Sequence, residues 1–257
     1  MKSPLIVFPM VYEARSTFKF FNEPLKCVLG GRCKFTLANG TECEALVSGI
    51  GCKKSAERVR ECVESFCPTD VVLCGFGGAC DEDMEIGEFV FQSGSAEISK
   101  FLSRNGMREG KIAYSEGVAD ENAKRKFASE GYDIVEMESA IFSAALGDDD
   151  FKPVLTHIRC VSDTLKTCVL YIKSRVKSPG STWELPLCAG VVESGLNLET
   201  GGFKISPLKS ISEIIKNPAS IPALIRFATV ANKARKIYEA KIPQVLTALF
   251  TNVGGKK

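Results

Sequence analysis

Two segments of the sequence place charged side chains where they could perform acid–base chemistry. Glu136 and Glu138 flank a methionine at the start of an apolar helical pattern, where the helix dipole favours negative charge. Arg159 and Asp163 lie four residues apart in a strand-like run, which puts their side chains on the same side of an extended chain. Taken separately, the first pair is equally well explained by ordinary acidity at a helix start, and the second pair by a structural ion pair.

A glycine cluster, Gly75-Phe76-Gly77-Gly78, follows a β-branched run and invites comparison with phosphate-binding loops. It lacks the Lys-Ser/Thr of a P-loop, and its spacing does not fit the dinucleotide-binding fingerprint. A glycine turn that lets the backbone approach a ligand remains open as an interpretation.

The 11 cysteines and the single histidine do not indicate a metal site. No CxxC pair occurs, the cysteine count is odd, and several cysteines fall inside apolar runs, which is typical of buried free thiols in a reducing compartment. His157 lies in a strand-like run without a G-x-S-x-G motif elsewhere, so we expect a structural role for it. The sequence therefore predicts neither a bound metal nor a cofactor.

Short apolar runs alternate with helical patterns over the first 160 residues. The predicted strands cover residues 5–8, 34–38, 44–48, 70–75, 88–92, 111–114 and 153–161, and the predicted helices cover residues 55–66, 120–130 and 137–146. This alternation indicates an α/β fold around a central mixed or parallel sheet. Ligands of such sheets gather at the carboxyl ends of the strands. Because the polar segments 10–13, 75–79 and 162–163 follow predicted strands, we expect them to converge on one site.

Composition and length indicate a globular protein. The chain has 257 residues, of which 45% are hydrophobic and 25% charged, and its net charge of +2 gives no electrostatic reason to expect nucleic acid binding. We interpret residues 1–257 as a single domain with an irregular insertion at about 164–210 and a helical tail at about 211–250. No run reaches the roughly 18 apolar residues that span a bilayer, and the N-terminus does not resemble a signal peptide. We therefore expect a cytoplasmic protein.

The tail carries an apolar stripe at residues 221, 224, 225, 228 and 231, with basic side chains on the opposite face. One interpretation is a surface helix that packs on the core. The other is a helix that contacts a membrane or a lipid.

Five segments together resemble the nucleoside phosphorylase/nucleosidase family. They are residues 10–13, 48–51, 75–87, 135–139 and 158–163, and they occur in the family's order and near its spacing. The E-M-E-S and R-x-x-S-D segments are the most specific of them, and the resemblance covers roughly residues 4–163. The most similar branch is typified by methylthioadenosine/S-adenosylhomocysteine nucleosidase. Residues 218–236 more loosely resemble the hopanoid-associated members, which act on adenosyl-lipid substrates.

This resemblance implies a three-layer α/β/α fold, with a central mixed sheet flanked by helices, and cleavage of the N-glycosidic bond between a purine and ribose through an oxocarbenium-like sugar. Glu13 matches the base that activates water, Arg159 would orient that water, and Asp163 matches the acid that protonates purine N7. Ser162 would orient Asp163, whose carboxyl group would have to hold its proton near neutral pH. Since related phosphorylases of 6-oxopurines commonly carry Asn at this position, Asp163 favours an adenine substrate.

Seven further positions would surround the nucleoside: Ile50, Phe76, Gly77, Gly78, Glu136, Met137 and Glu138. Glu138 matches the carboxylate that binds the ribose hydroxyls, Met137 would lie under the sugar, and Ile50 would line the side of the 5′-substituent. Gly77 and Gly78 would let the backbone come close to the base and sugar. Phe76 departs from the family, because many members carry a small or hydroxyl residue there.

Three functions remain open at this level. Hydrolysis of a 5′-substituted adenosine to adenine and a ribose derivative is favoured, because Glu13 would repel phosphate and the glycine-rich phosphate loop of many phosphorylases is not apparent. The alternatives are a purine nucleoside phosphorylase and a non-catalytic nucleoside-binding protein. The substituent could be a small thio group or a lipid. Relatives form dimers or hexamers, so the resemblance also implies a homo-oligomer.

Overall fold

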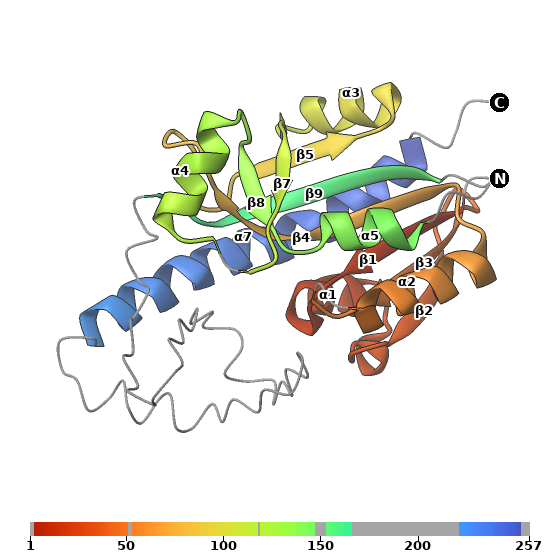
Figure 1. Ribbon diagram of the computed structural model, residues 1–257. Coiled ribbons are helices and arrows are strands. Elements are labelled where there is room, and N and C mark those ends of the chain that lie inside the picture. The colour runs from red at the N-terminus through yellow and green to blue at the C-terminus, as the bar shows by residue number, and fades with distance from the viewer. Residues whose placement is uncertain (1–2, 51–52, 118, 147–152, 166–220, 253–257) are drawn as a thin grey trace.

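A computed structural model of the chain describes residues 3–50, 53–117, 119–146, 153–165 and 221–252. Within these ranges, nine strands form one sheet (Figure 1). Its centre is a parallel set in the order β3-β1-β4-β9. These strands are β3 (Glu42–Val47), β1 (Pro4–Phe8), β4 (Asp70–Ala79) and β9 (Val154–Asp163). Because they are parallel, their carboxyl ends lie at the same edge of the sheet.

The other strands make the sheet mixed, as predicted. β2 (Arg32–Thr36) pairs antiparallel with β3, and β5 (Phe89–Ser93) pairs antiparallel with β9. The short β6 (Arg108–Glu109) runs parallel to β5. β8 (Ile134–Glu136) pairs antiparallel with the end of β4. On its other side, β8 pairs in parallel with β7 (Ile112–Tyr114).

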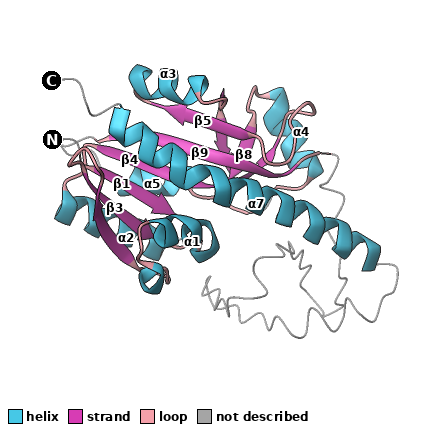
Figure 2. Ribbon diagram, turned by 180° about the vertical axis from the view of Figure 1, so that it is seen from behind, coloured by secondary structure: helices cyan, strands magenta, loops and turns pink. Residues whose placement is uncertain are grey.

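Helices cover both faces of the sheet, and this explains why β1 is apolar throughout. Leu5 and Val7 pack in a core with side chains of α2 (Lys53–Phe66) and with Phe142 of α5 (Ser139–Ala145). Ile6 and Phe8 point the opposite way and share a core with α1 (Val11–Phe20) and α7 (Ile221–Asn252). Figures 1 and 2 show α2 and α5 on one side of the sheet and α1 and α7 on the other. The three-layer α/β/α prediction is confirmed.

The tail helix α7 crosses the back of the sheet (Figure 2). Its buried side chains recur every three or four residues: Ala234, Tyr238, Ile242, Val245, Leu246, Leu249 and Phe250. Over these residues the core-packed interpretation is the one that the structure supports. The stripe predicted at residues 221–228 lies outside the side chains that the structure describes. None of the described helices is long and apolar enough to cross a membrane.

Some predicted boundaries change. The polar segment after β1 forms the helix α1, and α3 (Ala96–Arg104) and the short η1 (Pro24–Lys26) were not expected. β4 continues through the glycine cluster instead of ending before it. α4 (Glu121–Ser129) begins after its N-cap Asp120 and is followed by Gly131 at φ +82°, as the sequence predicted. Residues 166–210, where we expect the irregular insertion, lie outside the described ranges.

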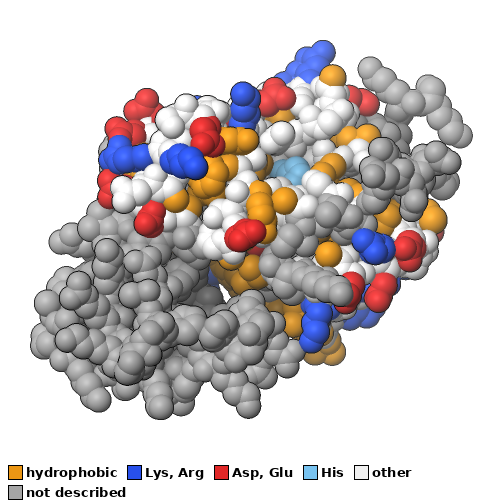
Figure 3. All heavy atoms as spheres, in the orientation of Figure 1, with side chains coloured by type: hydrophobic (Ala, Val, Ile, Leu, Met, Phe, Trp, Pro, Cys, Tyr) orange, Lys and Arg blue, Asp and Glu red, His pale blue; other side chains and the backbone are white. Residues whose placement is uncertain are grey.

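Acidic and basic side chains are interspersed over the described part of the face in Figure 3. That part of the surface therefore shows no uniformly basic patch of the kind that binds nucleic acid.

Candidate active site

The parallel strands bring the predicted polar segments to one edge of the sheet. Residues 10–13 follow β1, residues 48–50 follow β3, and residues 162–163 end β9. The Ser48 N–H donates to the Phe8 carbonyl at 2.9 Å, which holds the ends of β1 and β3 side by side. Half-buried Ile50 lies just beyond that contact. The convergence of segments 10–13, 75–79 and 162–163 is therefore present in the fold.

Glu13 lies in the first turn of α1 and is buried. Its Oε2 accepts the Met10 N–H at 2.8 Å, and its Oε1 accepts the Phe76 N–H at 2.9 Å. Burial raises the pKa of Glu13 to about 7, against the opposing effects of Arg159 and of the two N–H groups. A carboxyl group with this pKa exchanges its proton near neutral pH, which is what a general base requires.

Arg159 is fully buried and holds the acidic groups together. It forms an ion pair with Glu136, and its Nη2 lies 3.5 Å from Oε2 of Glu138. Gly75 gives it room, because a Cβ there would lie 2.6 Å from Arg159 Nη1 and 2.7 Å from Glu13 Oε1. Glu13 and Arg159 therefore both lie against one backbone position. Among the described residues, Nε and Nη1 of Arg159 have no hydrogen-bond partner, so donors remain for a ligand.

The two glutamates of the E-M-E-S segment have different environments. The Glu136 carboxylate accepts the N–H groups of Glu138 at 3.0 Å and Ser139 at 2.9 Å and so caps the start of α5. Burial acts to raise the pKa of Glu136, but Arg159 and these donors outweigh it and lower the pKa below its ordinary value. For Glu138, burial raises the pKa to about 8. Glu138 is therefore mostly protonated at neutral pH and can both donate to and accept from a hydroxyl group.

Asp163 lies in a second charged group that the sequence did not reveal. Its Oδ2 forms an ion pair with the ammonium of Lys124, a buried residue of α4. Its Oδ1 lies 2.8 Å from Ser162 Oγ, which is also 3.2 Å from the Gly77 carbonyl oxygen. Ser162 thus contacts the carboxylate that the resemblance implies it orients, but the ion-pair partner of Asp163 is a cation, Lys124. A proton-donating role for Asp163 stays a prediction, and Lys124 has to be included in it.

The glycine cluster makes room for side chains. A Cβ at Gly78 would lie 2.7 Å from Lys124 Nζ, and a Cβ at Gly77 would lie 2.6 Å from Ile134 Cγ2. The pairing of β4 with β9 shifts register between Gly77 and Gly78, where Ser162 is the extra residue. Such a bulge changes the direction of the side chains that follow it. The turn interpretation is therefore wrong for these glycines, which lie inside a strand.

Phe76 packs in an aromatic stack that involves the C-terminal helix. Its ring lies 5.2 Å from that of Tyr12, with an angle of 6° between the planes, and 4.7 Å from that of Tyr238 on α7. The large side chain of Phe76 therefore packs against a tyrosine that lies 162 residues later in the sequence. Half-buried Met137 lies between the two glutamates discussed above.

Three other buried side chains, His157, Cys74 and Cys160, have pKa values shifted from the ordinary ones. Burial lowers the pKa of His157 to about 4, which suits a structural histidine. Burial raises the pKa of Cys74 and Cys160 well above the ordinary value. No group of histidine, cysteine and acidic side chains within the described ranges could hold a metal ion.

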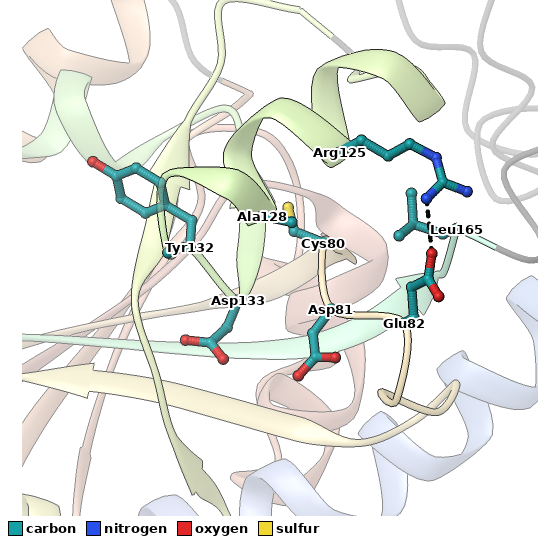
Figure 4. A pocket seen from close by; sticks show the side chains of 9 residues that line it. Cys80, Asp81, Glu82, Arg125, Ala128, Tyr132, Asp133 and Leu165 are labelled. Atoms are coloured by element: carbon teal, nitrogen blue, oxygen red, sulfur yellow. Dashed lines mark hydrogen bonds and ion pairs between the residues drawn. The ribbon is translucent and has the colours of Figure 1, made fainter.

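A surface hollow of about 430 Å³ lies beside α4 (Figure 4). Arg125 and Glu82 face each other across it as an ion pair, and Tyr132 and Asp133 line another part. None of the predicted site residues lines this hollow, so it is a separate feature.

Comparison with known proteins identifies the fold. No family model and no curated protein matches the chain. A futalosine hydrolase mutant of Helicobacter pylori matches with a TM-score of 0.53 at 18% identity, over 63% of this chain and 86% of that chain. A 5′-methylthioadenosine/S-adenosylhomocysteine nucleosidase of Helicobacter pylori, complexed with an amino-pyrrolopyrimidine compound, matches with a TM-score of 0.53 at 20% identity, over 63% of this chain and 85% of that chain. A mutant of the Helicobacter pylori nucleosidase with 5′-methylthioadenosine in its active site matches with a TM-score of 0.52 at 18% identity, over 63% and 86%. The chain therefore has the α/β fold of the methylthioadenosine/S-adenosylhomocysteine nucleosidases and of futalosine hydrolase.

Proposed function

We propose that the chain is a nucleosidase that hydrolyses the N-glycosidic bond of a 5′-substituted adenosine to adenine and a ribose derivative. The observation that carries this proposal is the buried group formed by Glu13, Glu138 and Arg159, which lies along β4 from the Lys124–Asp163 pair. The shared fold supports it, because structures with that fold include nucleosidases with 5′-methylthioadenosine or an amino-pyrrolopyrimidine compound bound.

Each of these three residues, Glu13, Glu138 and Arg159, has a role in this reaction. As the bond between the sugar and the purine breaks, positive charge develops on the sugar and negative charge on the base. Glu13 accepts a proton from the attacking water, which its pKa of about 7 allows near neutral pH. Glu138 exchanges hydrogen bonds with the ribose hydroxyls, and the Arg159 donors that have no partner among the described residues orient the water.

Glu136 has a positioning role in this scheme. Its carboxylate is occupied by Arg159 and by the first N–H groups of α5. It therefore fixes the guanidinium and the start of α5, and with them Met137 and Glu138, against the sugar.

Phosphorolysis is the second candidate, because Nε and Nη1 of Arg159, which have no partner in the part of the chain that the structure describes, could donate to a phosphate oxygen. Charge favours water. The guanidinium of Arg159 already forms an ion pair with the Glu136 carboxylate, and Glu13 is partly ionised near neutral pH, so a phosphate dianion would meet negative charge in a buried, poorly solvated space.

The test is to incubate the protein with 5′-methylthioadenosine, with and without phosphate, and to identify the sugar product. Free methylthioribose in both samples supports hydrolysis. A sugar 1-phosphate that forms only with phosphate supports phosphorolysis. If no adenine is released from this substrate or from an adenosine with a long 5′-alkyl chain, the enzyme proposal fails and a nucleoside-binding protein remains. The alkyl substrate also tests a lipid-linked substituent.

Two further parts of the proposal are a homo-oligomer, which the resemblance to dimeric and hexameric relatives supports, and a cytoplasmic location, which the sequence leads us to expect. Sedimentation equilibrium of the purified chain measures the oligomeric state. Fractionation of the source cells measures the location.

A further inference from the structure

We propose that residues 20–31, which connect α1 to β2, form a membrane-docking loop whose apolar side chains insert into an anionic lipid surface. This inference goes beyond the proposed function and does not depend on it, because the docking loop lies outside the group formed by Glu13, Glu138 and Arg159.

The first observation is where the exposed apolar side chains lie. Among the described residues, the large hydrophobic side chains that are exposed to solvent are those of Phe20, Leu25, Val28 and Leu29. Leu25 is 92% exposed, and the other three are 50–56% exposed. A single exposed leucine is ordinary in a folded protein. Their concentration in one short segment indicates an interaction surface.

The second observation is that the docking loop is held in place. The Gly30 N–H donates to the Val47 carbonyl at 2.8 Å, and the Val47 N–H donates to the Gly31 carbonyl at 3.0 Å, which fastens the loop to the end of β3. The turn before this contact is tight, because a Cβ at Gly31 would lie 1.9 Å from the Lys26 carbonyl oxygen. The backbone therefore fixes the apolar side chains in an exposed position.

The third observation is the charge around these side chains. Residues 14–34 contain five basic side chains and one acidic side chain, Glu23, which pairs with Lys26. Arg15 and Lys19 are exposed, lie one turn apart on α1 and form no ion pair with a described residue. The charge of Arg15 acts on the thiol of Cys27, so Arg15 lies close to the docking loop. Leucine and phenylalanine side chains bordered by unpaired lysine and arginine are typical of segments that lie in a membrane interface.

Charge also decides between a lipid surface and a second copy of the chain. A two-fold contact through the docking loop would bring the same surface of both copies together. Arg15 and Lys19 of one copy would then face those of the other, and this repulsion opposes the contact. An anionic lipid surface instead attracts both side chains.

The position of the docking loop relates it to the candidate site. The loop lies at the end of the sheet that carries β2, whereas α3 lies at the opposite end (Figure 1). A Cβ at Gly49 would lie 3.2 Å from Cδ1 of Leu29, so the loop adjoins the segment that follows β3. A protein docked through this loop would therefore have the β3 side of the candidate site close to the membrane.

The experiment is co-sedimentation of the full chain with vesicles of phosphatidylcholine mixed with phosphatidylglycerol, and with vesicles of phosphatidylcholine alone. We expect the wild type to sediment with the mixed vesicles and much less with the neutral ones. Binding should weaken as the salt concentration is raised from about 0.1 M to about 1 M, because the screening length falls from about 10 Å to about 3 Å.

Variants assign the binding to the docking loop. Leu25→Ser should lower the vesicle partition coefficient about 10-fold or more, because an apolar side chain no longer leaves water, whereas Leu25→Met should keep it within a few-fold. The double variant Arg15→Gln, Lys19→Gln should lower it by about 10-fold or more. The matched control is Lys100→Gln, Arg104→Gln, which removes two exposed basic side chains at the same spacing on α3 and should bind like the wild type.

The outcomes separate this inference from its alternatives. It is overturned if the wild type does not sediment with the mixed vesicles, or if Leu25→Ser and the α1 double variant bind as well as the wild type. It is also overturned if Leu25→Ser lowers the mass measured by sedimentation equilibrium and leaves vesicle binding unchanged, because the loop is then a contact between copies.

Adenine release in solution tests the proposed function separately. Since Leu25 is exposed and lies outside the catalytic group, Leu25→Ser should fold and release adenine like the wild type. A wild type that binds the mixed vesicles but releases no adenine would remove the nucleosidase proposal and leave the docking loop supported.

Discussion

The Glu13 carboxylate accepts the backbone N–H of Phe76 at 2.9 Å, which ties the first turn of α1 to the strand β4. The second oxygen of Glu13 is held by the Met10 N–H, so both oxygens have fixed positions. The Phe76 ring is in turn stacked on that of Tyr12 and packs against that of Tyr238 at an interplanar angle of 35°. The proposed base is therefore positioned by three elements, and one of them is the C-terminal helix α7.

Replacing the base tests its role most directly. We expect Glu13→Gln to lower kcat for adenine release by about 100- to 10,000-fold, because the amide cannot accept the proton of the attacking water. Adenine affinity should stay within a few-fold, since the base binds at the other end of the site. The control is Glu23→Gln, which changes a glutamate beyond the end of α1 that pairs with Lys26 on the surface. Equal activity of the two variants would remove Glu13 from the mechanism.

The pH dependence of kcat/KM provides an independent check. Glu13 acts as a base in its ionised form, and burial raises its pKa to about 7. Activity should therefore rise from about pH 6 as Glu13 ionises, and fall again above about pH 8 as Glu138 loses the proton that it shares with the ribose hydroxyls. A profile already flat between pH 5 and 7 would show that the group taking the proton is not Glu13.

Regular alternation and a few motifs were enough to predict most of the sheet. β1 was found because its residues are buried on both faces and all apolar, and α4 because Asp120 and Gly131 mark its ends. α1 was missed because its residues follow the strand β1 after only a two-residue connection and carry polar groups on most positions. The strand β4 was ended too early because glycines usually mark turns, whereas here they make room for charged side chains.

Lys124 could not have been found from the sequence. It stands in a row with Arg125 and Lys126, and nothing local distinguishes the one buried side chain from its exposed neighbours. Its partner is 39 residues away, and the room that it occupies depends on Gly78 of another strand. The Phe76–Tyr238 contact joins positions still further apart. From the sequence alone, Phe76 therefore departed from the family pattern without an apparent structural reason.

Stability should respond to pH through Glu138. Burial raises its pKa to about 8 in the folded protein, from an ordinary value of 4.5. Between these values the folded state binds more protons than the unfolded state, so this group makes the protein less stable as the pH rises from about 5 to 8. Glu138→Gln removes that dependence. Urea unfolding at pH 5.5 and 8 should show that the variant gains stability relative to the wild type at the higher pH. A constant difference at the two pH values would contradict the raised pKa.

Gly75 has no space for a side chain. A Cβ there would lie 2.6 Å from Arg159 Nη1 and 2.7 Å from Glu13 Oε1, and both groups are buried and held by other contacts. We expect Gly75→Ala to lower the free energy of unfolding by about 1–3 kcal/mol and to reduce kcat more than adenine affinity. Gly117→Ala is the matched control, since a Cβ at that position meets nothing within 4 Å. An active, fully stable Gly75→Ala protein would mean that Glu13 and Arg159 do not approach each other at this strand.

The aromatic stack predicts a separation of two effects at Tyr238. This side chain is fully buried, and its hydroxyl group has no hydrogen-bond partner among the described residues. Tyr238→Phe keeps the ring that supports Phe76 and removes a buried hydroxyl, so kcat should be unchanged and stability equal or slightly higher. Tyr238→Ala leaves a cavity beside Phe76 and should lower the free energy of unfolding by about 3–5 kcal/mol. It should also lower kcat at a temperature where the variant is still folded, because the Phe76 N–H that holds Glu13 loses its support. If Tyr238→Ala is destabilised but has the wild-type kcat, α7 stabilises the fold without positioning the base.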